Sequence, residues 1–232
     1  MTIEPTTHPA PAPVAESVAL GGRFRFALLA EDPRSMARRG RLTTTRGTVE
    51  TPAFMPVGTQ ATVKTLHPAE VRATGSQIIL ANTYHLMLRP GLEVLQEAGG
   101  LHRFMRWDGP ILTDSGGFQI FSLAENARVT EEGVRFASHI DGARWMMTPE
   151  RVVELQLGFG SDIMMQLDHL VGLPAERAAI ADATERSARW LERAIAAYVA
   201  RDGASSRSVL FGIQQGGMEA DLRRQSARRL AA

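Results

Sequence analysis

The sequence predicts an α/β protein built on a parallel sheet, and we favour a (β/α) barrel among the folds of that class. Five short apolar runs, near residues 54, 78, 111, 163 and 210, are each followed by a stretch of helical character. Strands and helices that alternate in this way form parallel sheets with helical crossovers. Polar residues follow successive strands, and no GxGxxG segment follows the first, which favours a barrel over a doubly wound sheet. An open five-stranded sheet is the alternative.

The composition and the order of the predicted elements divide the chain into an arm and one domain. Residues 1–22 are rich in Pro, Ala and Thr and lack aromatic residues, so we expect a disordered arm. Residues 23–232 are expected to form a partial barrel of about five βα units. Antiparallel strands precede the barrel strands, at 23–29 and on both sides of Arg46-Gly47. The barrel strands are expected at 53–57, 77–81, 111–113, 162–168 and 209–215.

Helices are expected over 68–74, 92–98 and 175–199 and in the segment that begins at Glu219. Asp141-Gly142 lies between two alternating runs and predicts an inserted hairpin. Thr148-Pro149 then predicts a helix start, with Thr148 as the N-cap and proline at the first helical position.

Composition excludes several classes of protein. The net charge of the 232 residues is +1, which gives no overall attraction to nucleic acids or membranes. The chain has no cysteine, which excludes disulfides and thiolate metal sites, and the histidines show no metal-ligand spacing. We therefore predict no metal site and no cofactor in this chain. It has neither a run of eighteen apolar residues nor a secretory signal, and we expect a cytoplasmic protein.

Polar side chains follow four successive predicted strands. Asn82 ends the second, Asp114 and Ser115 the third, Asp168 the fourth and Gln215 the fifth. In a barrel the active site lies at these C-terminal strand ends, so we expect the side chains to meet there. Each of them taken alone is explained equally well as a turn former or helix N-cap.

The polar side chains at these strand ends suit a purine ligand. Guanine presents two adjacent donors, which a carboxylate accepts together, and an acceptor at O6, which the Gln215 amide matches. Phe118 lies four residues after Asp114 and is a candidate stacking platform, although core packing is the commoner role of such a residue. Gly216, in "QGG", suggests close approach of the backbone to a ligand, or simply a tight turn.

Several blocks together resemble one enzyme family. "MPVGTQATVK", "NTYHLMLRPG", "LTDSGGFQIFSL", "EEGVRF", "GSDIMMQLD" and "LFGIQQGG" occur in the order found in the tRNA-guanine transglycosylases, also called queuine tRNA-ribosyltransferases. The resemblance runs from about Arg23 to the end of the chain. It implies a (β/α)₈ barrel that exchanges guanine at the tRNA wobble position for a 7-deazaguanine base, queuine or its precursor. In the family, an aspartate displaces guanine from the ribose and the incoming base then displaces the aspartate.

The resemblance also implies roles for individual residues. Asp114 matches the base-contacting general acid/base, and Asp168 and Gln215 match the residues that recognise the base. Ser115 and Gln119 match supporting residues, Asn82 a residue near the ribose, and Phe118 the stacking platform, which is often tyrosine in bacterial members. His169-Leu170 replaces the Glu-Cys usual in bacterial members, so the base that is accepted stays open.

The family's nucleophilic aspartate and its structural zinc site of three cysteines and a histidine match nothing in these residues. We therefore expect a chain truncated before the later strands and the zinc subdomain, and inactive alone. The resemblance implies tRNA and the two kinds of base as partners, and a homodimer or heterodimer for the full-length protein. Two other functions stay open: a non-catalytic barrel subunit that binds RNA or a partner, and a sugar hydrolase that uses Asp114 and Asp168 as its carboxylate pair.

Overall fold

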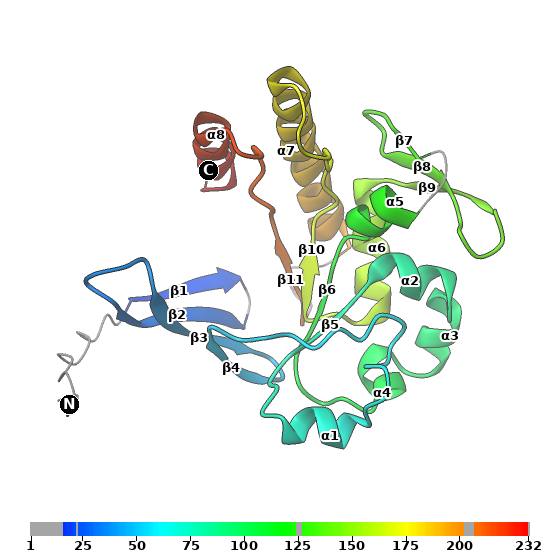
Figure 1. Cartoon of the computed structure of the whole chain (residues 1–232). Helices are drawn as coiled ribbons and strands as arrows, with labels where there is room; N and C mark the ends of the chain where they lie inside the picture. The colour runs from blue at the N-terminus through cyan, green and yellow to red at the C-terminus, as the bar shows by residue number, and fades with distance from the viewer. Residues whose placement is uncertain (1–15, 22, 124–126, 202–206, 232) are drawn as a thin grey trace, which may run out of the picture.

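A parallel sheet forms the centre of the molecule. The computed structural model describes residues 16–21, 23–123, 127–201 and 207–231. The sheet has the order β11-β10-β6-β5 (Figure 1). Its strands are β5 (Ile79–Ala81), β6 (Ile111–Thr113), β10 (Ile163–Met165) and β11 (Val209–Phe211). Each strand lies beside its successor in the sequence, so these strands lack the reversal of order that defines a doubly wound sheet.

Helices connect the strands, as predicted. They are α1 (Pro68–Ala73), α2 (Thr83–Leu88), α3 (Leu92–Glu97), α4 (Leu101–Met105), α5 (Gly117–Leu123), α6 (Pro149–Phe159), α7 (Arg177–Ala200) and α8 (Ala220–Ala231). The start of α6 is confirmed: Thr148 accepts a 3.1 Å hydrogen bond from the Arg151 N–H, and Pro149 takes the first helical position. No helix of the described residues is long and apolar enough to cross a membrane.

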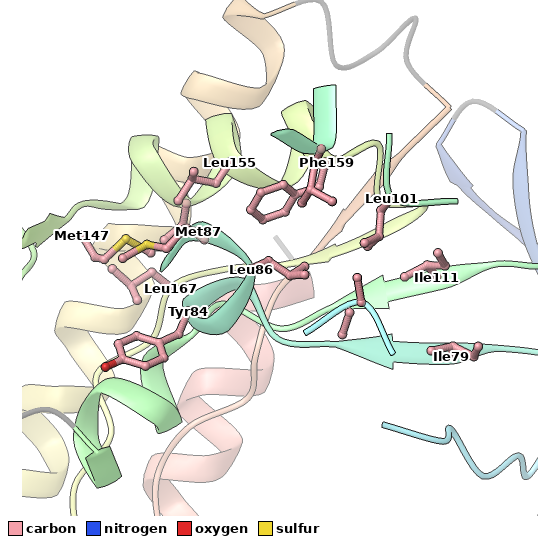
Figure 2. Packing of buried hydrophobic residues seen from close by; sticks show 14 of the residues in the cluster. Ile79, Tyr84, Leu86, Met87, Leu101, Ile111, Met147, Leu155, Phe159 and Leu167 are labelled. Carbon is pink, nitrogen blue, oxygen red and sulfur yellow. The ribbon is translucent and has the colours of Figure 1, made fainter. Parts of the chain in front are cut away.

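Alternate residues of each strand point to opposite faces of the parallel sheet, and other elements cover both faces. On one face Ile79 and Ile111 pack with Leu86 of α2 and Leu101 of α4, as Figure 2 shows, in a cluster that includes Phe159 of α6. The opposite face packs against an antiparallel sheet of β1 (Glu16–Gly21), β2 (Phe24–Glu31), β3 (Arg38–Thr44) and β4 (Gly47–Thr51). The residues in that contact are Leu112, Ile163 and Val209 from the parallel sheet and Phe24, Leu42 and Val49 from the antiparallel one.

The inserted hairpin is confirmed as part of a small third sheet. This sheet consists of β7 (Arg128–Val129), β8 (Val134–Ala137) and β9 (Arg144–Met147), and Asp141-Gly142 lies in the turn between β8 and β9. Figure 1 shows it beside α5 and α6, at the same end of the molecule as the C-terminal end of β10.

Several expectations need correction. The strands expected at 162–168 and 209–215 are shorter and end at Met165 and Phe211. The strand expected at 53–57 is reduced to one parallel bridge between Val57 and Leu80, because Pro52 and Pro56 have no N–H for a ladder. The bounds of helices α2, α4 and α5 were not predicted from the sequence. Within the arm expected over 1–22, Glu16–Gly21 form β1, whose backbone pairs with β2. The rest of that arm, 1–15 and 22, lies outside the described residues.

Candidate active site

Asp114 directly follows β6, and its carboxylate accepts three hydrogen bonds. Oδ1 accepts from the backbone N–H groups of Thr83 (3.0 Å) and Gly116 (3.1 Å). Oδ2 accepts from the side-chain amide of Asn82 at 2.5 Å. Burial nevertheless raises the pKa of Asp114, because these bonds to the charged form only partly offset its lost hydration. The site thus holds a carboxylate in one orientation while favouring its protonation.

The turn-former interpretation is right for Asp114 and wrong for Asn82. The bond from Gly116 to Asp114 spans two residues, as in an Asx turn, and it leads the chain into α5. Asn82 occupies the N-cap of α2 but makes no side-chain cap there. Its amide reaches across to Asp114 on the next strand, so the residue serves the site rather than its own helix.

Asp168 follows β10 and is 7% exposed. Its Oδ2 accepts a 2.7 Å hydrogen bond from the Gln215 side-chain amide, and its Oδ1 accepts from the Ser115 hydroxyl at 3.4 Å. Burial is the main cause that raises its pKa to about 6, and the negative charge of Asp114 adds to the rise. Gly117 leaves space for this carboxylate, since a Cβ at that position would lie 3.1 Å from Asp168 Oδ1.

The structure therefore brings four predicted residues together from four neighbouring strands. Asn82 and Asp114 form one hydrogen-bonded pair, and Asp168 and Gln215 form the other. Ser115 lies between them: its hydroxyl donates to Asp168 and accepts from the N–H of Gly117 at 3.2 Å. Two carboxylates with raised pKa values, held by amides at one edge of the sheet, are typical of a binding or catalytic site.

Phe118 and Gln119 extend from the first turn of α5. Phe118 is 62% exposed, which excludes core packing and leaves its ring available to a ligand. Gln119 lies beside Asp114, and its amide lowers the pKa of that carboxyl. The Gln119 Oε1 is buried and has no hydrogen-bond partner among the described residues. A buried acceptor without a partner is unfavourable, and a donor from a ligand would satisfy it.

Gly216 has a structural explanation independent of any ligand. Its φ is +115°, and a Cβ would lie 2.5 Å from the backbone nitrogen of Arg223 in α8. Glycine at this position lets α8 approach the chain after β11. In α8, Ser226 accepts a 2.9 Å hydrogen bond from the Gln215 N–H, which positions that side chain near Asp168.

A cavity of about 210 Å³ adjoins Gln215 and Gly216. Its apolar lining is Leu170, Val171, Leu173 and Ile180.

Sequence reasoning did not identify Thr83 or the contact between Tyr84 and His139. Thr83 donates to Asp114 twice, from its N–H and, at 2.6 Å, from its hydroxyl to the Asp114 carbonyl oxygen. The Tyr84 hydroxyl and His139 Nδ1 are hydrogen-bonded at 2.7 Å. These partners lie 31 and 55 residues apart, so no local pattern indicates them. His85 packs edge-on against both rings, and burial lowers its pKa.

The described residues contain no group of three His, Cys, Asp or Glu side chains that could bind a metal ion. The 232 residues also contain no cysteine, so the zinc site implied by the resemblance has no counterpart in them.

Comparison with known proteins shows the family of this chain. The model of the queuine tRNA-ribosyltransferase family matches residues 32–232, which include every residue of the site. The chain belongs to this family. It is 58% identical over 205 residues to the queuine tRNA-ribosyltransferase of Desulforudis audaxviator, with 88% of this chain and 54% of that protein covered. The corresponding values are 56% over 208 residues for Ruegeria pomeroyi, with 90% and 54% covered. For Symbiobacterium thermophilum they are 54% over 208 residues, with 90% and 51% covered.

The chain spans about half the length of these curated relatives.

Proposed function

We propose that the site binds guanine and that these residues form the base-recognition part of a tRNA-guanine transglycosylase. The reaction exchanges guanine at the wobble position of tRNA for a 7-deazaguanine base by double displacement. The relatives' shared name, queuine tRNA-ribosyltransferase, supports this reaction class. The sequential parallel strand order supports a (β/α) barrel as the complete fold.

The contact between Asp168 and Gln215 carries the proposal. A carboxylate can accept from the N1–H and the exocyclic amine of guanine together. Gln215 donates one amide hydrogen to Asp168 at 2.7 Å, and an amide NH₂ has a second hydrogen to offer to O6. This donor and acceptor pattern matches guanine, and it mismatches adenine, which has an amine where guanine has O6.

Asp114 has the properties of a general acid/base. Burial raises its pKa above the ordinary value of 3.8, and its three hydrogen bonds hold both oxygens in place. A group with such a pKa can give a proton to a leaving purine and take one from an incoming base. We assign two groups to the ribose side of the site. They are Asn82, which orients Asp114, and Gln119, whose Oε1 has no partner among the described residues. Phe118 is assigned to the face of the base.

Base binding is tested by titration calorimetry with guanine, hypoxanthine and adenine. Hypoxanthine lacks only the exocyclic amine, so one hydrogen bond to the Asp168 carboxylate is lost. Such a bond to a charged group contributes roughly 1.5–3 kcal/mol, which corresponds to roughly 10- to 150-fold weaker binding. Equal affinity for the three purines would contradict the assignment. Binding of free sugars in their place would favour the sugar hydrolase.

The exchange reaction is tested with labelled guanine, a guanine-bearing tRNA and the polypeptide encoded by the complete reading frame. Incorporation of label is expected, and Asp114→Ala should abolish it. A non-catalytic subunit would bind the tRNA without incorporating label, and incorporation that persists in Asp114→Ala would contradict the role of that residue.

A further inference from the structure

The sheet of β7, β8 and β9 has one buried face and one cationic face. Val134, Phe136 and Met147 point into the core. The opposite face is formed by the alternate residues, and three of them are exposed arginines: Arg128 on β7, Arg135 on β8 and Arg144 on β9. We call these three residues the arginine face. A chain with a net charge of only +1 thus concentrates positive charge on one small surface.

The arginine face places like charges opposite each other, which destabilises the protein when no anion is bound. Arg128 lies directly opposite Arg135 in the antiparallel register, and Arg144 is the diagonal neighbour of Arg135. Like charges at directly opposed positions destabilise a sheet. Glu132 pairs with Arg135 at 3.5 Å, and this contact is exposed to solvent. Arg128 and Arg144 have no carboxylate partner among the residues that the structure describes. Binding of an anion relieves the repulsion between these guanidinium groups.

The sheet is fixed in place at both ends. At the turn between β7 and β8, Glu131 accepts hydrogen bonds from Arg186 (3.3 Å) and Arg189 (2.7 Å) of α7. At the turn between β8 and β9, His139 is hydrogen-bonded to Tyr84. Tyr84 directly follows Thr83, which donates to Asp114. The arginine face is therefore attached to the same helix that orients the site carboxylate.

We propose that the arginine face binds backbone phosphates of the RNA whose base enters the site. The proposal rests on the proposed function, which names RNA as the substrate. Guanidinium groups bind phosphates through paired N–H donors, and contacts to phosphates position a nucleic acid without reading its sequence. The face would hold the strand beside the pocket while Asp168 and Gln215 select the base.

The test is RNA binding by the triple variant Arg128→Gln, Arg135→Gln, Arg144→Gln, measured by fluorescence anisotropy with a labelled stem-loop RNA that carries guanine in its loop. For single strands, each phosphate contact contributes about 0.7 to the slope of log affinity against log salt. Loss of three contacts should lower the slope by about 2, which corresponds to about 100-fold weaker binding at about 0.1 M salt. The triple Lys variant keeps the charge and should retain most of the affinity.

The matched control is Arg72→Gln, Arg103→Gln, Arg106→Gln. It removes the same charge from α1 and the region of α4, at the far end of the molecule in Figure 1. This control should keep its salt slope, and equal slopes for the two triple variants would overturn the proposal. Since the arginines oppose each other, the first variant should melt no lower than the parent, and a lower melting temperature would count against the proposal.

Guanine titration separates this proposal from the proposed function. Both triple variants should bind free guanine as the parent does. Normal guanine binding with an unaltered RNA salt slope would reject the arginine face alone. Absence of guanine binding in the parent would reject the proposed function, and the RNA slopes would still decide whether the arginine face binds phosphates.

Discussion

The side-chain amide of Gln215 donates a 2.7 Å hydrogen bond to Asp168, a buried carboxyl whose pKa is raised to about 6. The two residues come from adjacent strand ends, and the chain between them includes all of α7. The contact holds the Asp168 carboxyl in one orientation through Oδ2, and burial places the titration of that carboxyl near neutral pH inside the site.

Guanine affinity is predicted to depend on pH through Asp168. Only the carboxylate form accepts both guanine donors, and that form is lost as pH falls through about 6. Affinity should be constant above about pH 7 and fall by about tenfold for each further pH unit below 6. Calorimetric titration between pH 5 and 8 measures this, and affinity that does not change with pH would contradict a carboxylate acceptor.

The free energy of unfolding should depend on pH through the same Asp168 carboxyl. Its pKa is higher in the folded protein than its ordinary value of 3.8, so the folded state binds more protons between about pH 4 and 6. Stability from this group is complete below pH 4 and is lost as pH rises to about 6. A rise from 3.8 to about 6 corresponds to about 3 kcal/mol. Asp168→Asn removes the effect, so its stability relative to the parent should increase over that range and then stay constant.

Urea unfolding at several pH values provides the measurement. Asp141→Asn is a suitable contrast, because a hydrogen bond from the Ala143 N–H lowers the pKa of Asp141. The difference between that variant and the parent should grow as pH rises toward about 4 and stay constant above it, with the parent the more stable of the two, which is the opposite sign. A constant difference between Asp168→Asn and the parent would show that Asp168 has an ordinary pKa.

Asn82→Ala is predicted to raise the pKa of Asp114 further. The Asn82 amide donates to the charged carboxylate at 2.5 Å, and removal of that donor favours the protonated form. The titration of the Asp114 carboxyl carbon, followed by NMR, should shift to higher pH. Thr83→Val is the matched control, since it removes the hydroxyl bond to the Asp114 carbonyl oxygen but keeps the N–H bond to the carboxylate. Equal titration of both variants would contradict the role of Asn82.

Phe118→Ala should weaken guanine binding and leave stability almost unchanged. The ring is 62% exposed, so its removal should change the free energy of unfolding by no more than about 0.5 kcal/mol. Loss of stacking on a base costs about 1–3 kcal/mol of binding free energy. Phe118→Tyr should bind normally, because tyrosine keeps the aromatic face. Phe121 lies on the same helix and is 54% exposed, so Phe121→Ala controls for loss of a surface ring. Similar losses of affinity in both alanine variants would reject Phe118 as the platform.

The sequence alone determined most of the element order and the chemistry of the site. Ile111–Thr113 is a strand as predicted, and Thr148 and Pro149 start α6, because apolar periodicity and capping are local properties. The polar strand ends were identifiable because parallel strands place their C-terminal residues at one edge. Glu16–Gly21 differed from expectation because strand pairing depends on which backbone partner is in reach, and 53–57 differed because Pro52 and Pro56 have no N–H for a ladder.

Only the tertiary structure decided how the site residues are used. Asn82, Thr83 and Asp114 form one unit and Ser115, Asp168 and Gln215 another, through contacts that span 31 to 53 residues. The raised pKa values follow from burial, which depends on everything packed around the carboxyls. The exposure of Phe118, the packing of Gly216 against α8 and the arginine face have the same origin. Which side chains are buried and which stay exposed depends on how distant segments pack together, and the order of residues along the chain does not specify that packing.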